Sequence, residues 1–149
     1  HNVGAIIRTA AGFGSAGILM PERGQAPITA AVIKSSAGAA FRIPLCTSPD
    51  LSKSLQDLKK KGFMLFALTG SSAGKSATKD TDPLESFTFN GPTAFIMGNE
   101  GEGIPKQLLS LCDARIDIPL HPRVESLNVA AATAATLSYW SQQHPEALQ

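Results

Sequence analysis

The sequence predicts an α/β fold built around a doubly wound parallel sheet. Short apolar segments of strand length alternate along the chain with segments of helix length, an order typical of such sheets. The segments 63–68 and 93–97 are almost continuously apolar, as expected of parallel strands that are covered on both faces. A chain of 149 residues predicts one domain with a core large enough to fold alone.

Capping residues and apolar spacing predict the elements of the first half. Ser48 and Pro49 are favoured at the N-cap and at the first helical position, so they predict a helix that runs from there to Gly62. Asn2 is the expected N-cap of the first helix. The other elements expected here are a helix over residues 3–12, a strand over 17–20, a helix over 28–37 and a strand over 43–47.

The second half continues the alternation. The polar segment 70–86 follows the strand at 63–68 and predicts a long loop at the carboxyl edge of the sheet, where ligands of such folds bind. The remaining elements expected are a strand over 93–97, a glycine-rich loop over 98–103, a short helix over 105–111, a strand over 116–118 and a helix over 129–140. Because no strand precedes the first helix, we expect that the first strand of the pattern is missing from this chain.

The composition excludes several classes of protein. The hydrophobic fraction is 43% and the charged fraction is 17%, which are ordinary values for a globular protein. No apolar run is long enough to span a membrane, and the chain does not start with a signal segment. Cys46 and Cys112 lack metal-binding spacing and predict buried free thiols in a reducing compartment such as the cytoplasm. The net charge of +1 neither requires nor excludes a nucleic-acid partner.

Three stretches carry candidate functional residues. The segment 118–129 crowds Arg123, Glu125, Ser126 and Asn128 between a strand end and a helix start, where unpaired backbone groups can bind a ligand. The loop 98–103 could be a plain turn, but its three glycines in six positions indicate that the backbone approaches a ligand or another segment closely. Arg8 lies on an otherwise apolar helix, and a structural role is the commoner one for such a residue taken alone.

Two other patterns are weaker. Residues 70–76 end in Gly-Lys-Ser after a strand, but three residues separate the glycines where a phosphate loop needs four, so we interpret them as a flexible loop. His121 is interpreted as a solvated loop histidine, because no Ser–His–Asp arrangement and no cluster with metal-ligand spacing accompanies it.

Taken together, the three stretches resemble the three signature motifs of the SpoU (TrmH-type) RNA methyltransferases, a family of the SPOUT superfamily. The order and spacing of the motifs both match, and the resemblance covers nearly the whole chain. The residues that carry it are 2–10, 97–103, and 118–120 with 124–129.

The resemblance implies a parallel-sheet SPOUT fold whose C-terminal part forms a deep trefoil knot, which the general rule against knots would not predict. It implies a single catalytic domain over residues 1–149, and relatives often carry an upstream RNA-binding domain. The implied reaction is transfer of a methyl group from S-adenosylmethionine to a ribose 2′-hydroxyl of structured RNA, by a homodimer without a membrane or metal partner. Several rRNA-directed relatives share a turn similar to residues 36–40, so the resemblance favours rRNA over tRNA as substrate.

The resemblance also implies which residues form the site. Gly98, Ile118 and Leu127 match donor-contacting residues, and Arg8 matches the motif arginine that helps to activate the ribose hydroxyl, in its own or in the partner's site. The remaining residues implied in donor binding are Thr69, Gly70, Asn99, Gly101 and Leu120, and those implied in organising catalysis are Glu100, Ser126 and Asn128.

Two departures from the family pattern stand beside these matches. Residues 121–123, His-Pro-Arg, replace a non-basic turn and could add an RNA phosphate contact, and residues 130–133 replace a serine that often follows Asn-Val. A catalytically silent RNA-binding or dimerisation module of the same fold is the alternative interpretation. The presence of Arg8, Glu100, Ser126 and Asn128 argues against it.

Overall fold

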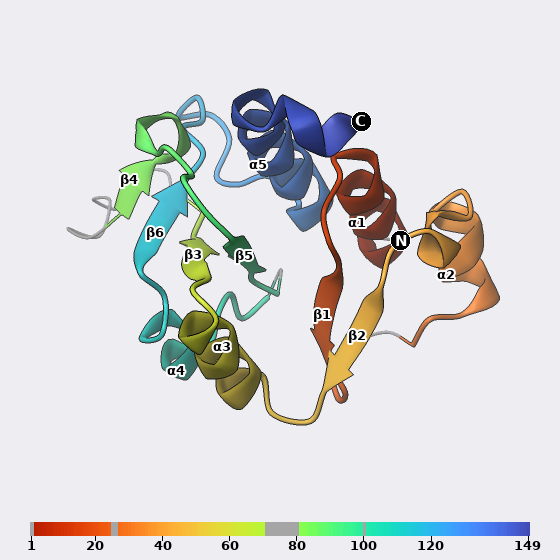
Figure 1. Ribbon diagram of the computed structural model, residues 1–149. Coiled ribbons are helices and arrows are strands. Elements are labelled where there is room, and N and C mark those ends of the chain that lie inside the picture. The colour runs from red at the N-terminus through yellow and green to blue at the C-terminus, as the bar shows by residue number, and fades with distance from the viewer. Residues whose placement is uncertain (1, 25–26, 71–80, 100) are drawn as a thin grey trace. The chain divides into compact units, whose positions relative to one another are not determined.

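The computed structural model describes residues 2–24, 27–70, 81–99 and 101–149 (Figure 1). The elements of the first half are α1 (Asn2–Gly12), β1 (Ile18–Pro21), α2 (Ala30–Ser35), the 3-10 helix η1 (Ala39–Phe41), β2 (Leu45–Ser48) and α3 (Leu51–Lys60). Those of the second half are β3 (Met64–Leu68), β4 (Thr81–Pro83), η2 (Leu84–Ser86), β5 (Thr93–Met97), α4 (Lys106–Leu109), β6 (Ala114–Asp117), α5 (Val129–Gln143) and η3 (Pro145–Leu148).

The strands form two sheets in which every pair is parallel. One sheet joins β1 to β2, and the other has the order β4-β6-β3-β5. The predicted α/β class with parallel strands is therefore confirmed. The described strands are divided between two sheets, however, where the sequence predicted one.

The chain divides into two compact units. The first contains residues 1–51 and 133–149, and the second contains residues 52–132. In the first unit, α1 packs against both α2 and η1. Gly4 permits this approach, since a methyl group there would overlap the Ser35 hydroxyl and would lie 2.9 Å from the carbonyl oxygen of Val32.

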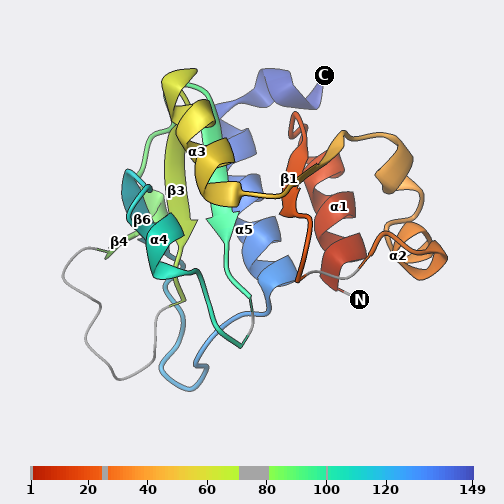
Figure 2. The ribbon, with the colours of Figure 1, turned by 90° about the horizontal axis from the view of Figure 1, so that it is seen from below.

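The core of the second unit surrounds the central strand β3. Leu65, Phe66 and Ala67 of this strand are buried, as is Ile116 of β6. The ring of Phe66 meets that of Phe89 edge to face, with centroids 5.1 Å apart. Helices α3 and α4 lie on one face of this sheet (Figure 2). None of the described helices is long and apolar enough to cross a membrane.

Three expectations from the sequence were wrong in detail. Ser48 does not cap α3: it is the last residue of β2, pairs with Pro21, and accepts a hydrogen bond from the Asp50 N–H at 3.1 Å. Within the segment 70–86, the described residues 81–86 form β4 and η2 instead of a loop, since β4 pairs with β6. Neither cysteine is buried as expected, although both are free: Cys46 is exposed on β2, and Cys112 is half-buried.

Asp113 connects three parts of the second unit. Its carboxylate accepts hydrogen bonds from the Leu65 N–H at 2.8 Å and from Lys59 Nζ at 2.6 Å, and its own N–H donates to the Leu65 carbonyl oxygen at 2.7 Å. Partial burial acts to raise the pKa of the Asp113 carboxyl, but the Leu65 N–H and the Lys59 ammonium outweigh it and lower that pKa. The ionised carboxylate therefore stabilises the folded state.

We expect Asp113→Asn to lower the free energy of unfolding at pH 7 by about 1 kcal/mol, a value reduced by the partial exposure of Lys59. A carboxyl whose pKa is lowered on folding stabilises the protein above its unfolded pKa of about 3.9 and loses that effect as the pH falls through the folded value. The difference between wild type and variant, measured by urea unfolding, should be constant from pH 7 to about pH 5. It should shrink below about pH 4. A difference that grows in acid would contradict this account.

Candidate functional site

The candidate site lies in the second unit, where three parallel strands end at the same edge of a sheet. β3, β5 and β6 end at Leu68, Met97 and Asp117, and β3 pairs with each of the other two. The segments that follow these strands surround a pocket of about 650 Å³. This volume lies in the range of about 300–1,000 Å³ that is typical of small-molecule sites. The carboxyl edge of a parallel sheet is also where such folds bind ligands.

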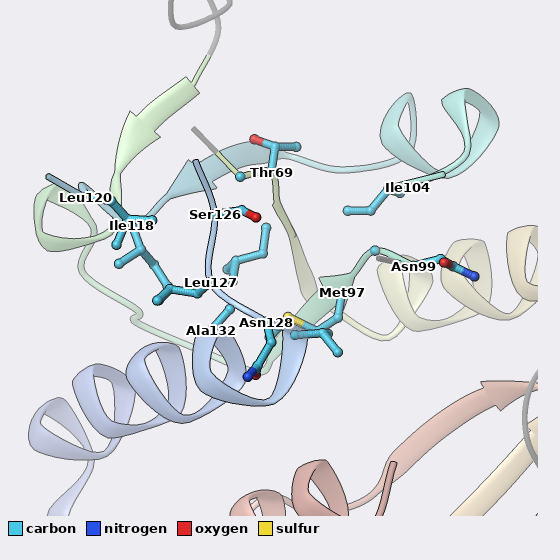
Figure 3. A pocket seen from close by; sticks show the side chains of 15 residues that line it. Thr69, Met97, Asn99, Ile104, Ile118, Leu120, Ser126, Leu127, Asn128 and Ala132 are labelled. Atoms are coloured by element: carbon cyan, nitrogen blue, oxygen red, sulfur yellow. The ribbon is translucent and has the colours of Figure 1, made fainter. Parts of the chain in front are cut away.

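Apolar walls and a few polar groups make up the pocket. In Figure 3, Ile118, Leu120 and Leu127 lie on one side, and Asn99 and Ile104 lie on the other. None of the described lining residues carries a charge. The residues that line the pocket are Leu68, Thr69, Gly70, Met97, Gly98, Asn99, Gly103, Ile104, Ile118, Leu120, Ser126, Leu127, Asn128, Val129 and Ala132.

The loop after β5 closes on itself beside the pocket. Asn99 and Gly103 exchange two backbone hydrogen bonds of 3.0 and 2.9 Å, and the side-chain oxygen of Asn99 accepts from the Gly101 N–H at 2.9 Å. A methyl group on Gly98 would lie 2.9 Å from the carbonyl carbon of Gly103 and 3.1 Å from the nitrogen of Ile104. Gly98 must therefore be glycine for the loop to close as it does.

The segment between β6 and α5 supplies the opposite wall. The Val124 N–H donates to the carbonyl oxygen of His121 at 2.9 Å, and the Arg123 N–H donates to His121 Nδ1 at 3.2 Å, so this histidine stabilises a turn. The chain then passes Ser126, whose hydroxyl forms no hydrogen bond with the residues that the structure describes. Ser126 Cβ lies 3.8 Å from the position that a methyl group on Gly70 would occupy, which brings the segments after β3 and β6 together.

Asn128 is the N-cap of α5. Its Oδ1 accepts from the Ala131 N–H at 2.8 Å, and its carbonyl oxygen accepts from the Ala132 N–H at 3.0 Å. The side-chain bond satisfies a donor that would otherwise lack a partner in the first turn, and the backbone bond is the first one of the helix itself. The cap fixes where α5 begins, and it thereby fixes Leu127 and Val129 at the pocket wall.

We expect Asn128→Ala to lower the free energy of unfolding by about 1 kcal/mol, because the cap is lost. Asn128→Asp is the matched control, since aspartate caps helices about as well as asparagine. Chemical unfolding followed by circular dichroism would measure both. Equal stability of the alanine variant and the wild type would contradict the capping role, and an inactive but stable aspartate variant would indicate a second role at the site.

The structure brings most of the predicted site residues together. Thr69, Gly70, Gly98, Asn99, Ile118, Leu120, Ser126, Leu127 and Asn128 all line the one pocket. Gly101 does not line it, and Glu100 lies outside the described residues. Arg8 is exposed on α1 in the first unit. The ligand and the catalytic roles of these residues stay predictions.

Six lining residues were not predicted from the sequence. Gly103 lies within the glycine-rich loop that was singled out, so its place could have been anticipated. The others are Leu68, Met97, Ile104, Val129 and Ala132, whose apolar character does not distinguish a pocket wall from a core. Among the described residues, no group of histidine, cysteine, aspartate or glutamate side chains is arranged to hold a metal ion.

Comparison with known families decides the assignment. Residues 1–138 match the SpoU rRNA Methylase family. The chain belongs to this family. The SpoU match includes all three motif stretches, two of which converge on the pocket.

Two curated relatives illustrate the range within the family. The chain is 36% identical over 137 residues to the 23S rRNA (guanosine-2′-O-)-methyltransferase RlmB of Xanthomonas campestris, with 92% of this chain and 52% of the relative covered. It is 39% identical over 137 residues to an uncharacterized tRNA/rRNA methyltransferase of Synechocystis, with 92% of this chain and 34% of the relative covered. The chain thus spans about half or less of the length of these relatives.

A solved SpoU structure has a similar fold. The SpoU methyltransferase AviRb from Streptomyces viridochromogenes, solved in complex with its cofactor AdoMet, superposes with a TM-score of 0.83 at 25% identity. The superposition covers 97% of this chain and 56% of AviRb. The similarity supports the α/β fold with parallel sheets that is described above.

Proposed function

We propose that this chain is the catalytic part of an RNA methyltransferase that transfers a methyl group from S-adenosylmethionine to a ribose 2′-hydroxyl. The observation that carries the proposal is the pocket at the carboxyl ends of β3, β5 and β6. Two of the three SpoU motifs meet there, and the third motif contains Arg8. AviRb, a member of the same family with a similar fold, binds the same cofactor.

The pocket suits S-adenosylmethionine in size, polarity and charge. Apolar side chains such as Ile118, Leu120 and Leu127 would hold the flat adenine, and Thr69 and Asn99 offer polar groups to its ribose and amino-acid portions. The uncharged described lining does not repel a sulfonium cation. When bound, the cofactor would supply a methyl group activated by that positive sulfur, so the protein's main task is to position the nucleophile.

Arg8 is the residue that we assign to the nucleophile. The side chain is exposed on α1 and forms no ion pair with the described residues, so its guanidinium is available to RNA. A guanidinium is a poor base but a strong partner for developing negative charge. We assign Arg8 to polarising the 2′-hydroxyl and holding the adjoining phosphate. We assign Ser126 and Asn128 to fixing the segment between β6 and α5.

The substrate and the assembly follow the family. We propose structured RNA as substrate and favour rRNA over tRNA, in line with the 23S rRNA named for the Xanthomonas relative. We also propose the trefoil knot and the homodimer of the SpoU family, with Arg8 serving its own pocket or that of the partner. Sedimentation of the full-length protein measures the oligomeric state. We place the reaction in the cytoplasm, where thiols such as Cys46 and Cys112 stay reduced.

Isothermal titration of the full-length protein with S-adenosylmethionine tests the donor site. We expect saturable one-site binding that S-adenosylhomocysteine competes for and that Leu127→Ala weakens. An absence of binding would favour the alternative, a silent RNA-binding or dimerisation module.

Mapping of ribose methylation in total RNA from cells with and without the gene tests the reaction itself. We expect one site or a few sites, most of them in rRNA, to lose methylation in cells that lack the gene. Methylation that is unchanged at every mapped ribose would contradict the proposed activity.

A further inference from the structure

Phe41 is the most exposed large hydrophobic residue that the structure describes, with 78% of its surface accessible. It ends the 3-10 helix η1, and its ring stacks on none of the described aromatic rings. A single exposed apolar side chain is common on protein surfaces and does not by itself indicate a binding site. The turn that carries Phe41 and the charged residues beside it indicate a binding role for this side chain.

The turn that carries Phe41 is built rigidly. Ser36 is fully buried, and its hydroxyl donates to the Ile33 carbonyl oxygen at 2.8 Å and accepts from the Ala40 N–H at 3.3 Å. The Phe41 N–H donates to the carbonyl oxygen of Gly38 at 3.1 Å. Ala37 has a φ of 51°, a left-handed conformation that is uncommon for a residue with a side chain. The ring is therefore presented to solvent from a fixed backbone, which lowers the entropy lost on binding.

Two positively charged side chains flank this turn in the sequence. Arg42 follows Phe41 directly, and Lys34 lies on α2 just before the turn, and both are exposed. Neither forms an ion pair with the residues that the structure describes. Both cations are thus available to bind phosphate groups.

Arg8 lies on α1, the helix that contacts the same turn. Gly4 and Arg8 are four residues apart on α1, so they share one face of that helix. Gly4 is the position at which α1 approaches Ser35, where α2 ends. Arg8 is one helical turn further along this face, and α1 also contacts η1, which contains Phe41.

We propose that Phe41 is a stacking platform for an unpaired nucleobase of the RNA substrate, beside the ribose that Arg8 holds, with Arg42 and Lys34 on the flanking phosphates. Aromatic side chains bind unstacked bases in this way, and neighbouring cations track the backbone. The inference rests on the proposed function, because it takes Arg8 as the residue at the reacting ribose. An aromatic side chain flanked by cations that form no ion pair with the described residues fits RNA better than a protein partner, because lysine is depleted at protein interfaces.

Three substitutions in the full-length protein test the platform. Phe41→Ala removes the ring, Phe41→Leu keeps apolar bulk without a π face, and Phe41→Trp keeps a larger π face. The RNA probe is total RNA from a strain that lacks the gene. Methylation of this RNA is measured with a tritiated donor, and its binding is measured in a filter assay. We expect alanine and leucine to weaken RNA binding about five- to a hundredfold and tryptophan to retain it. The melting temperature and the affinity for S-adenosylmethionine should match the wild type, because the side chain is exposed and lies outside the donor pocket.

Fluorescence gives a direct readout of stacking. Trp140 is the only tryptophan of this sequence. The emission of the wild type is therefore subtracted from that of the Phe41→Trp variant to give the emission of residue 41. A base that stacks on residue 41 should quench the added emission, and single-stranded oligoadenylate is the probe.

The outcomes separate the platform from the proposed function itself. A wild type that neither binds the donor nor methylates RNA would overturn the proposed function. An active wild type whose Phe41→Ala variant binds and methylates RNA equally well would overturn the platform alone. A leucine variant as good as the wild type, or an alanine variant that changes the oligomeric state, would assign Phe41 to a protein contact instead.

Discussion

Replacing Arg8 with alanine should lower methyl transfer to RNA by about a hundredfold or more, while the affinity for S-adenosylmethionine stays unchanged. The loss is large because the guanidinium would stabilise negative charge that develops on the 2′-oxygen as the methyl group is transferred. The interaction with the developing charge contributes to the rate, whereas the contact of Arg8 with the adjoining phosphate contributes to RNA binding. Single-turnover methylation with a tritiated donor measures the rate, and calorimetry measures the affinity.

Because Arg8 is exposed, its replacement should affect activity without affecting stability. An exposed side chain without an ion pair among the described residues should contribute less than about 0.5 kcal/mol to stability, so the variant should melt with the wild type. Arg23, which is exposed in the same unit, supplies the matched control: Arg23→Ala removes the same charge from another part of the unit. Arg8→Lys should restore only part of the rate, because an ammonium lacks the planar fork that binds two acceptors.

Two results would contradict the assignment. An Arg8→Ala variant that transfers methyl groups at the native rate removes Arg8 from the chemistry. Equal losses in the Arg8 and Arg23 variants would assign both residues to general attraction of RNA, and this loss should then fade as salt is raised.

Continuous apolar runs allowed β3 and β5 to be predicted well. The segment 93–97 was predicted from five residues without a charge, and β5 has those bounds. The same pattern placed β3 within one residue. A strand covered on both faces leaves this clear pattern in the sequence, because both sets of alternating side chains must be apolar.

Elements that depend on long-range pairing could not be predicted in the same way. Ser48 has the local signature of a helix cap, but pairing of β2 with β1 places it at the end of a strand. β4 reads Thr-Asp-Pro, which is turn chemistry locally, and it is a strand only because β6 lies beside it at the sheet edge. In both cases a partner far along the chain outweighs the local preference.

The candidate site shows the same division. The motif resemblance named most of the polar and glycine positions of the pocket and three apolar ones, but it missed Gly103. Leu68, Met97 and Ile104 were missed because apolar wall residues look like core residues in a sequence. The resemblance also treated Gly98 and Gly101 alike. Only the geometry distinguishes them: an added methyl group would clash with backbone at Gly98 and would make ordinary contact at Gly101.

That difference yields the second prediction of large effect. Gly98→Ala should reduce the affinity for S-adenosylmethionine at least about tenfold and destabilise the protein by about 1–3 kcal/mol. The added methyl group would lie 2.9 Å from the Gly103 carbonyl carbon and 3.0 Å from its Cα. Both are backbone atoms that cannot rotate away, so the bridge between Asn99 and Gly103 must open and the pocket wall must move.

Gly101→Ala is the matched control within the same loop. Among the described residues, its methyl group would meet only the side-chain oxygen of Asn99, at an ordinary 3.7 Å, and Gly101 does not line the pocket. Calorimetric titration and thermal unfolding of the two variants should therefore separate them, with Gly101→Ala close to the wild type in both. Because the variants add the same methyl group to one loop, equal affinities would mean that the wall formed by Gly98 does not contact the donor. Equal losses in both variants would mean that the loop responds to any added bulk, and the specific closure at Gly98 would then not be the cause.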